Sequence, residues 1–214
     1  MKEKDLNDFR EEYDKAALDT DRLPDSPLIL FDQWLEEAIQ SGQPEPNAMT
    51  LATVTPDSKP AARTVLLKEV ASDHFIFYTN YESQKGKELE ANPHAALVFL
   101  WLDMQRQVRI SGPAEKVSAA RSDAYFAARP EESRIGALAS PQSQTIDSRE
   151  SLEKKFAALK TQLQGKTIER PKHWGGYQVK AEQIEFWQGR QSRLHDRILY
   201  TKEGNHWHRQ RLAP

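Results

Sequence analysis

The 214-residue sequence predicts a mainly β fold with flanking helices, organised as an antiparallel barrel or an α+β domain. Strand-like segments follow one another in runs, with only a few helical segments between them. This order differs from the strand–helix alternation of a doubly wound sheet. The length is that of one domain. We expect residues 26–214 to form it, with residues 1–25 as a flexible N-terminal arm.

Composition and charge restrict the function. The formal net charge is −2, so no overall basic field attracts nucleic acid or anionic lipid. The sequence has no cysteine, which excludes disulfides, thiolate nucleophiles and cysteine-based metal sites and agrees with a reducing compartment. The N-terminus is charged from Lys2, and no apolar run reaches membrane-spanning length. We therefore expect a cytoplasmic protein without nucleic-acid or membrane partners.

The arm is densely charged and has few apolar residues, which is typical of a segment that orders on a partner or ligand. Arg10 and Tyr13 would reach a ligand site from it, and the alternative is that they are surface residues of a frayed helix. The first firm element is a helix in which Ser26 is the cap and Pro27 the first residue. Apolar residues form a stripe along one side of this helix, and Gly42 ends the helix.

Strand signals dominate the next part of the chain, where β-branched and aromatic residues are frequent. We expect strands over residues 49–55, 61–68, 74–79, 95–101 and 106–112. The first two form a hairpin around a turn at 56–60. After the third strand, Ser83 caps a short basic helix that runs to Glu90 and stops at Asn92-Pro93.

Two helices and three strands are expected in the rest of the chain. One helix covers residues 118–128. The other begins at Asp147, with Glu150 three residues on in a capping-box pattern, and ends near Gln164. Residues 129–146, between these helices, are expected to form a long polar loop, and loops of this length are often functional. The last strands are expected near residues 177–187, 197–201 and 206–211.

Any phosphate bound by this chain must be held by side chains, because the sequence has neither a G-x-G-x-x-G nor a G-x-x-x-x-G-K-[ST] motif. Arg63 and Lys68 stand at the two ends of a strongly apolar strand. Cations in this position often mark the entrance of a ligand site, although cations at surface strand ends are more common. Tyr78-Thr79 ends the next strand. Ser83 and Lys85 then open a helix, where free N–H groups favour a phosphate.

Tyr125, Arg129 and Ser133 recur at a four-residue interval. On a helix that runs into a loop they would line one side and match a phosphate monoester. The alternative is a helix-end arginine in water. Two phosphate-holding clusters, aromatic residues near arginines and no evident nucleophile favour two phosphorylated aromatic ligands, such as flavin mononucleotide (FMN) and a phosphorylated substrate.

The segment 193–197 carries a third group of polar residues. If it is extended, Arg193, His195 and Arg197 share one face, where an anionic or electron-rich ligand would relieve their repulsion. The alternative is a solvated strand face. Asp196 would point to the opposite face, which argues against a dyad with His195. His206 and His208 also alternate, but no further ligand is evident, so we expect a surface strand and no metal.

A set of short motifs runs in order through nearly the whole chain, from about Arg10 to Pro214. The two most specific are Glu185-Phe-Trp-Gln-Gly189 and Arg193-Leu-His-Asp-Arg197. The others are Arg63-x-Val-Leu-Leu-Lys68, Phe77-Tyr-Thr-Asn80, Arg106-Gln-Val108, Gln142-Ser143, Trp174-Gly-Gly176 and Arg211-Leu-Ala-Pro214. Together these motifs resemble those of the pyridoxamine/pyridoxine 5′-phosphate oxidase family.

The resemblance implies an FMN-binding split β-barrel that forms a homodimer, with two FMN sites at the subunit interface. It assigns FMN contacts, some of them from the partner subunit, to Arg63, Val65, Leu66, Lys68, Tyr78, Thr79, Gln84, Lys85, Gln107, Gln142, Ser143, Trp187 and Arg197. It assigns substrate contacts to Arg10, Tyr13, Lys68, Tyr125, Arg129, Ser133, Arg193 and His195. Arg193 and His195 would be the catalytic residues, because they would orient the pyridine ring.

One position departs from the family pattern. Where the family often carries arginine, this chain has Gln84. Loss of a cation beside the FMN phosphate would weaken FMN binding by about 1–3 kcal/mol if nothing compensates.

The implied activity is the oxidation of pyridoxamine 5′-phosphate and pyridoxine 5′-phosphate to pyridoxal 5′-phosphate, in vitamin B6 salvage or biosynthesis. A hydride would pass from C4′ to FMN, and O2 would be reduced to H2O2. One alternative is another split-barrel flavin reductase with a nicotinamide donor, which the cluster of Tyr125, Arg129 and Ser133 disfavours. The other is a non-catalytic carrier of flavin or pyridoxal phosphate, which would keep the same binding residues.

Overall fold

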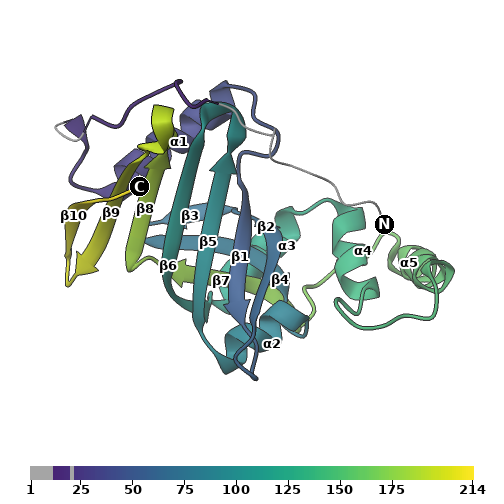
Figure 1. Ribbon diagram of the computed structural model, residues 1–214. Coiled ribbons are helices and arrows are strands. Elements are labelled where there is room, and N and C mark those ends of the chain that lie inside the picture. The colour runs from purple at the N-terminus through teal and green to yellow at the C-terminus, as the bar shows by residue number, and fades with distance from the viewer. Residues whose placement is uncertain (1–11, 20–21) are drawn as a thin grey trace, which may run out of the picture. The chain divides into compact units, whose positions relative to one another are not determined.

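The computed structural model describes residues 12–19 and 22–214, and Figure 1 labels its helices and strands. Contacts between residues group the chain into two units. Unit 1 comprises Met1–Asn47, Val98–Ile110 and Glu182–Pro214, and unit 2 comprises Ala48–Leu97 and Ser111–Ala181. Two strands, β5 (His94–Trp101) and β6 (Arg106–Lys116), contribute residues to both units.

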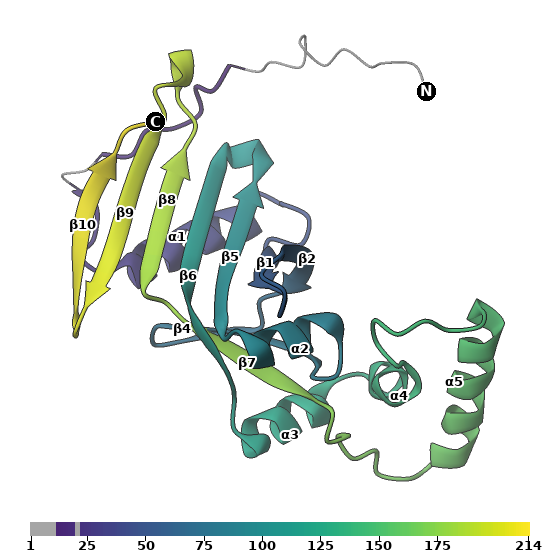
Figure 2. The same ribbon diagram turned by 60° about the horizontal axis from the view of Figure 1, so that its bottom comes forward.

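Unit 1 is built on a sheet with the strand order β10-β9-β8-β6-β5, whose strands lie side by side in Figure 2. The strands that belong to this unit alone are β8 (Gln183–Gln188), β9 (Asp196–Glu203) and β10 (His206–Leu212). They pair antiparallel in sequence order, β8 with β9 and β9 with β10. This register places the start of β9 opposite the end of β8, so the residues around Asp196 and Gln188 are neighbours.

Helix α1 (Pro27–Gln40) covers this sheet with its apolar side. The Trp34 ring meets Phe186 of β8 edge to face, with 5.2 Å between ring centroids. The Phe31 ring packs in the same way on Phe99 of β5 at 5.1 Å. Phe31, Phe99 and Phe186 are almost completely buried, so the hydrophobic effect fixes the helix on the sheet.

Unit 2 contains the remaining strands and helices. Its strands are β1 (Ala48–Val54), β2 (Pro60–Leu66), β3 (Glu69–Ala71), β4 (His74–Asn80) and β7 (Trp174–Lys180). Its helices are α2 (Gln84–Ala91), α3 (Ala119–Ala128), α4 (Glu131–Ala139) and α5 (Arg149–Leu163). Antiparallel pairs join β1 to β2, β3 to β4, β4 to β7 and β7 to β6. This is the mainly β, antiparallel fold with flanking helices that the sequence predicts.

Helix α2 is held close to the strand that precedes it. The Ser83 hydroxyl accepts a hydrogen bond from the Gly86 N–H at 3.3 Å, which confirms Ser83 as the cap. A Cβ atom at Gly86 would lie 2.1 Å from the carbonyl oxygen of Tyr81, so only glycine allows this approach. The approach buries the side chains of Lys85 and Glu88, which are central to the site described below.

One predicted loop is wrong in part. Residues 129–146 were expected to be a polar loop, but helix α4 occupies Glu131–Ala139. Glu131 and Glu132 lie in its first turn, where carboxylates favour a helix. Ile135 and Ala139, one turn apart, are both buried, and Ile135 packs in a cluster with Phe126 and Trp174. Tertiary packing of this short apolar face therefore outweighs the Ser- and Gln-rich composition of the segment.

Three smaller expectations also need correction. The cap of α5 is Ser148, whose side chain accepts from the Ser151 N–H at 3.1 Å, and not Asp147. The single strand expected near 177–187 is two strands, β7 and β8, because the chain turns at Ala181 and Glu182. The short strand β3 was not expected, since three residues give too little periodicity to detect. The other predicted helices and strands are confirmed within a few residues.

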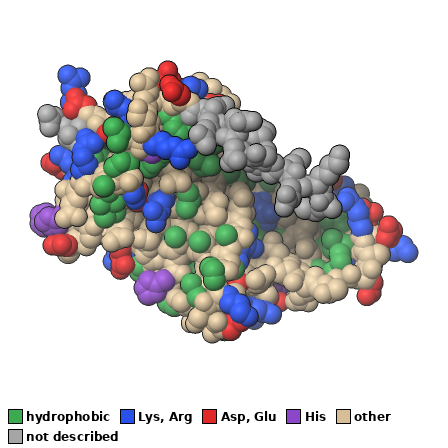
Figure 3. Space-filling view, in the orientation of Figure 1, with side chains coloured by type: hydrophobic (Ala, Val, Ile, Leu, Met, Phe, Trp, Pro, Cys, Tyr) green, Lys and Arg blue, Asp and Glu red, His purple; other side chains and the backbone are tan. Residues whose placement is uncertain are grey.

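The surface carries mixed charge. On the face shown in Figure 3, basic and acidic side chains are interspersed among apolar and neutral ones, in keeping with the net charge of −2. Within residues 12–19 and 22–214, no helix combines the length and the apolar character needed to cross a membrane.

The packing of α4 leads to a stability prediction. Ile135→Ala removes a completely buried side chain and is expected to lower the free energy of unfolding by about 2–5 kcal/mol, measured by urea denaturation. Ile146→Ala is the matched control, because Ile146 is 41% exposed, and its effect is expected to stay within about 0.5 kcal/mol. Equal small losses in both variants would contradict the packing of α4.

Candidate functional site

A buried carboxylate, Glu88, organises the start of helix α2 in unit 2. Its Oε2 accepts from Arg63 Nη2 at 2.6 Å and from the Thr53 hydroxyl at 2.5 Å. Its Oε1 accepts from Gln84 Nε2 at 2.8 Å. Burial alone would raise the pKa of Glu88, but these hydrogen bonds outweigh it and lower the pKa. Glu88 is therefore ionised and holds the guanidinium of Arg63 in place.

Lys85, three residues before Glu88, is a buried cation with mainly neutral partners. Its Nζ donates to the Gln142 side-chain oxygen at 3.4 Å, and the Thr79 hydroxyl donates to the same oxygen at 3.2 Å. Burial lowers the pKa of Lys85, Arg63 lowers it further, and Glu88 opposes both. Because both cations share one carboxylate, an anionic ligand here would relieve their repulsion and restore the charge balance.

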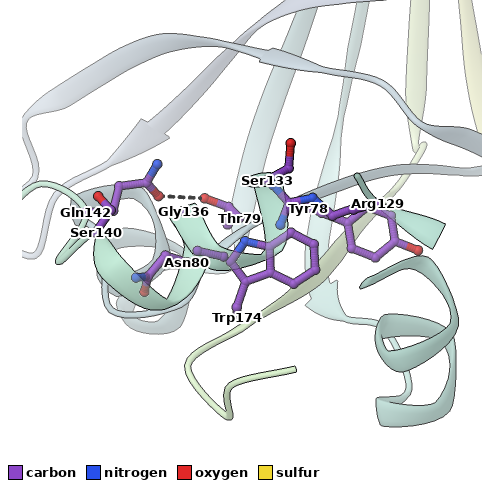
Figure 4. Close-up of a pocket in the computed structure, with 10 residues that line it drawn as sticks. Tyr78, Thr79, Asn80, Arg129, Ser133, Gly136, Ser140, Gln142 and Trp174 are labelled. Atoms are coloured by element: carbon purple, nitrogen blue, oxygen red, sulfur yellow. Dashed lines mark hydrogen bonds between the residues drawn. The ribbon is translucent and has the colours of Figure 1, made fainter. Parts of the chain in front are cut away.

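A stack of aromatic rings lies beside this cluster. The Tyr78 and Tyr125 rings are stacked, with centroids 3.7 Å apart and an interplanar angle of 9°. Trp174 is nearly parallel to both, at 5.7 Å from Tyr78 and 6.2 Å from Tyr125. The Arg129 guanidinium lies 4.5 Å from the centroid of the Trp174 ring. Figure 4 shows Tyr78 and Trp174 with Arg129 and Ser133 around one pocket.

The pocket is a cavity of about 390 Å³ with a polar rim. It is lined by Tyr78, Thr79, Asn80, Arg129, Ser133, Gly136, Ala137, Ser140, Gln142 and Trp174. Arg129 Nη1 is buried and has no hydrogen-bond partner among the described residues. Burial lowers the pKa of Arg129, although Tyr125 opposes the shift. A buried N–H without an acceptor is costly unless a ligand supplies one, so the cavity is suited to an anion.

The sequence pattern Tyr125, Arg129, Ser133 is explained by two helices instead of one. Tyr125 lies on α3, Arg129 follows the end of α3, and Ser133 lies on α4. Arg129 and Ser133 line the same cavity. Tyr125 contacts it through its stack with Tyr78. The residues are therefore brought together as expected, although the helix that was expected to run into a loop is followed by α4.

Unit 1 has its own aromatic cluster, formed by Tyr13, Trp187 and His195. The Trp187 and His195 rings are 4.6 Å apart, and Tyr13 lies 5.9 Å from Trp187 and 5.7 Å from His195. Tyr13 and Trp187 also line a cavity of about 590 Å³, together with Lys15, Leu100, Leu102, Asp103, Gln105 and Gln107. This cluster offers aromatic faces and an imidazole to a planar ligand.

The protonation of His195 follows from its hydrogen bond. The backbone N–H of Arg190 donates to His195 Nδ1 at 3.1 Å. An N–H donates only to an unprotonated ring nitrogen, so the neutral ring carries its proton on Nε2. Burial lowers the pKa of His195, and the charge of Arg193 lowers it further. His195 is therefore a hydrogen-bond donor through Nε2 near neutral pH.

The segment 193–197 is not fully extended, which corrects the sequence prediction. Residues Gln191–Arg193 form a tight turn in which Ser192 and Arg193 have positive φ values of 55° and 59°, and β9 begins only at Asp196. The alternation of faces therefore does not reach Arg193, whose side chain is exposed. Arg197 donates from Nε to Glu185 at 2.8 Å and from Nη1 to the carbonyl of Ala213 at 3.0 Å.

The remaining predicted site residues have less distinctive surroundings. Val65 and Leu66 are half-buried on β2. Lys68 and Ser143 are exposed, and Ser143 has a positive φ of 69°. Arg10 lies outside the described residues. The exposed residues His206 and His208 lie on β10, as expected for a surface strand, and the part of the chain that the structure describes has no group of three acidic or histidine side chains arranged to hold a metal ion.

Sequence analysis missed two residues that shape these sites. Glu88 was not proposed, although it follows Gln84 by four residues on a predicted helix, and a cationic site needs a nearby counter-charge. Trp174 belongs to the motif Trp174-Gly-Gly176 but has no predicted role, because only the fold places the Arg129 guanidinium over its ring.

The chain matches two family models. Residues 35–163 match a model described as pyridoxamine 5′-phosphate oxidase, and residues 174–214 match one described as the pyridoxine 5′-phosphate oxidase C-terminal dimerisation region. The curated relatives include a pyridoxine/pyridoxamine 5′-phosphate oxidase of Rubrobacter xylanophilus, 52% identical over 99% of this chain and 97% of the relative. The enzyme of the same name from Microcystis aeruginosa is 53% identical over 98% of both chains.

Solved structures agree on the fold. PhzG from Burkholderia lata, in complex with tetrahydrophenazine-1-carboxylic acid, superposes with a TM-score of 0.89 at 30% identity and covers 95% of this chain and 100% of its own. A pyridoxamine 5′-phosphate oxidase-related, FMN-binding protein of Nostoc punctiforme superposes with a TM-score of 0.70 at 18% identity, over 90% of this chain and 100% of its own. By fold, family models and near full-length similarity, the chain belongs to the pyridoxamine 5′-phosphate oxidase family.

Proposed function

We propose that the protein oxidises pyridoxamine 5′-phosphate and pyridoxine 5′-phosphate to pyridoxal 5′-phosphate with FMN as cofactor. The observation that carries this proposal is the buried, unpartnered N–H of Arg129 in a cavity walled by aromatic rings. Such a cavity suits the phosphate of a small aromatic ester. The names of the curated relatives support the same substrates.

FMN fits the cations of unit 2. Arg63 and Lys85 would hold its phosphate, because both are cations near the buried start of α2 and share the single carboxylate of Glu88. Gln84 would act indirectly. Its amide donates to Glu88, and the contact with the phosphate would come from Arg63. The remaining cofactor contacts are assigned as in the sequence analysis, with Trp187 offering an aromatic face.

The substrate residues divide into phosphate and ring contacts. Arg129 and Ser133, with Tyr125 and Lys68, would bind the phosphate. Arg193 and His195 would orient the ring, His195 by donating a hydrogen bond from Nε2. When bound, FMN would supply the acceptor for a hydride from C4′, and O2 would take the electrons and yield H2O2; pyridoxine 5′-phosphate would give the aldehyde directly, whereas pyridoxamine 5′-phosphate would give an imine that water hydrolyses to the aldehyde and ammonia. The chain's own part is to bind and orient the substrate, and no side chain is assigned as a general base.

We also propose that the protein is a homodimer. The match of residues 174–214 to a dimerisation region supports this assembly. Such a dimer is the arrangement in which both subunits contribute contacts to FMN.

The first test is the visible spectrum of the FMN-loaded protein under anaerobic conditions. Pyridoxamine 5′-phosphate is expected to bleach the flavin band, and air is expected to restore it, because the substrate would reduce the flavin and O2 would reoxidise it. A band that persists with this substrate but bleaches with NADPH would favour a flavin reductase. A band that persists with both would favour a non-catalytic carrier. Protein that retains no FMN would contradict the cofactor assignment.

Replacement of Arg129 tests the phosphate site. Arg129→Ala is expected to raise KM for pyridoxamine 5′-phosphate about 10- to 100-fold with little change in kcat, because the phosphate is bound alike in the ground and transition states. Steady-state kinetics measure both constants. Arg149→Ala is the control, since this arginine is exposed and pairs with Glu153 on the same helix, α5. An unchanged KM in Arg129→Ala would remove the residue from the site.

Two replacements of His195 test its role as a donor. Gln places an amide N–H near the position of Nε2, whereas Asn places one near Nδ1. His195→Gln is therefore expected to keep the larger kcat/KM, by up to about tenfold. In the unsubstituted enzyme, kcat/KM is expected to fall only below pH 6.5, the ordinary pKa, because the pKa of His195 is lowered and protonation of Nδ1 breaks the bond from Arg190. An Asn variant as active as Gln would argue against donation from Nε2.

A further inference from the structure

The carboxylate of Asp196 joins three segments of unit 1 that are far apart in the sequence. Its Oδ2 accepts from the Leu18 backbone N–H at 3.1 Å and from Arg190 Nη1 at 3.2 Å. Its Oδ1 accepts from Arg211 Nη1 at 2.7 Å. Asp196 is only 8% exposed. We call Asp196, Leu18, Arg190 and Arg211 the carboxylate hub.

The hub is one of several anchors of the segment 12–19. Another is Gln105, which accepts from the Lys15 N–H at 3.3 Å and donates to the Glu12 carbonyl at 3.4 Å. The Asp103 carbonyl also accepts from Lys15 Nζ at 2.7 Å. Leu18 is itself buried. Tyr13 lies between Glu12 and Lys15 in sequence, so its position depends on these anchors together.

The position of Tyr13 is tightly defined by its neighbours. A Cβ atom at Gly189 would lie 2.9 Å from Cγ of Tyr13, so the ring rests directly on the backbone at this glycine. The same ring contacts Trp187 and His195. If the segment 12–19 were released at Leu18, these ring contacts would lose one of their supports.

The hub also acts on His195, through Arg190. Arg190 donates its side chain to Asp196, and its backbone N–H donates to His195 Nδ1. One carboxylate therefore fixes both the segment that carries Tyr13 and the residue that sets the tautomer of His195. Its charge is needed for this, because it balances two arginines in a largely buried place.

We propose that Asp196 is a positioning residue that seats Tyr13 over His195 by holding Leu18 and Arg190. Asp196 does not itself touch the substrate. The proposal rests on the proposed function, since His195 is assigned there to the substrate, as the family resemblance also assigns Tyr13. It goes further because it names the residue on which their arrangement depends.

The test uses the full-length, FMN-loaded enzyme with Asp196→Asn and Asp196→Ala. KM for pyridoxamine 5′-phosphate is expected to rise about tenfold in the Ala variant and less in Asn, which keeps one acceptor oxygen, while kcat changes less than about threefold. A purely structural defect would lower the active fraction, and hence kcat, without changing KM. Glu203→Gln is the control, because it removes a carboxylate from the far end of the same strand, where Glu203 is exposed and pairs with exposed His208.

Amide hydrogen exchange measures how firmly the segment 12–19 is held, and this measurement does not require turnover. In Asp196→Ala, the amides of Leu18 and Lys15 are expected to exchange about tenfold faster than in the unsubstituted enzyme and in Glu203→Gln. Unchanged KM together with unchanged exchange would overturn the proposal. If the unsubstituted enzyme showed no oxidase activity, the proposed function would fail, and the exchange rates would still decide whether Asp196 seats the segment.

A second pair of variants leaves Asp196 in place, in case its replacement prevents folding. Leu18→Pro removes the N–H that donates to Asp196, and Leu18→Ala removes the buried side chain but keeps the N–H. The proposal predicts a higher KM and faster exchange of the Lys15 amide in Leu18→Pro than in Leu18→Ala. Equal values in the two variants would show that the hydrogen bond to Asp196 does not seat the segment.

Discussion

The pairing of buried carboxylates with arginines is the interaction on which both candidate sites depend. Glu88 holds Arg63 in unit 2, and Glu185 and Asp196 hold Arg197 and Arg190 in unit 1. Each carboxylate is less than 10% exposed, so each would be costly without its partner. Because the partner arginines lie at the edge of the buried region, pairing fixes charged groups where a ligand can reach them.

The two units contribute different chemistry. Unit 2 supplies cations and a free guanidinium N–H around a cavity whose wall is a stack of Tyr78, Tyr125 and Trp174. These features suit phosphate groups. Unit 1 supplies the rings of Tyr13, Trp187 and His195, with an imidazole fixed as a donor. These features suit a planar ring.

Gln84 illustrates how a departure from a family pattern is accommodated. Its amide donates to Glu88, which keeps the carboxylate satisfied without adding a positive charge. The pKa of Glu88 is still lowered, so the carboxylate stays charged for Arg63. In the proposed FMN site, the cost of the missing cation would therefore depend on Lys85, whose own pKa is lowered by burial. The charges and hydrogen bonds of these four residues therefore depend on one another: Gln84, Glu88, Arg63 and Lys85.

The sequence by itself determined the mainly antiparallel fold, most element positions and the cap Ser83. It did so because hydrophobic periodicity, caps and short motifs are local. Tertiary structure decided which residues meet. It places the Arg129 guanidinium over the Trp174 ring, pairs Glu88 with Arg63 and lets the Leu18 N–H donate to Asp196. It also formed α4 within an expected loop and turned the chain at Ser192 and Arg193. These outcomes depend on burial and charge pairing between distant segments, which no local pattern encodes.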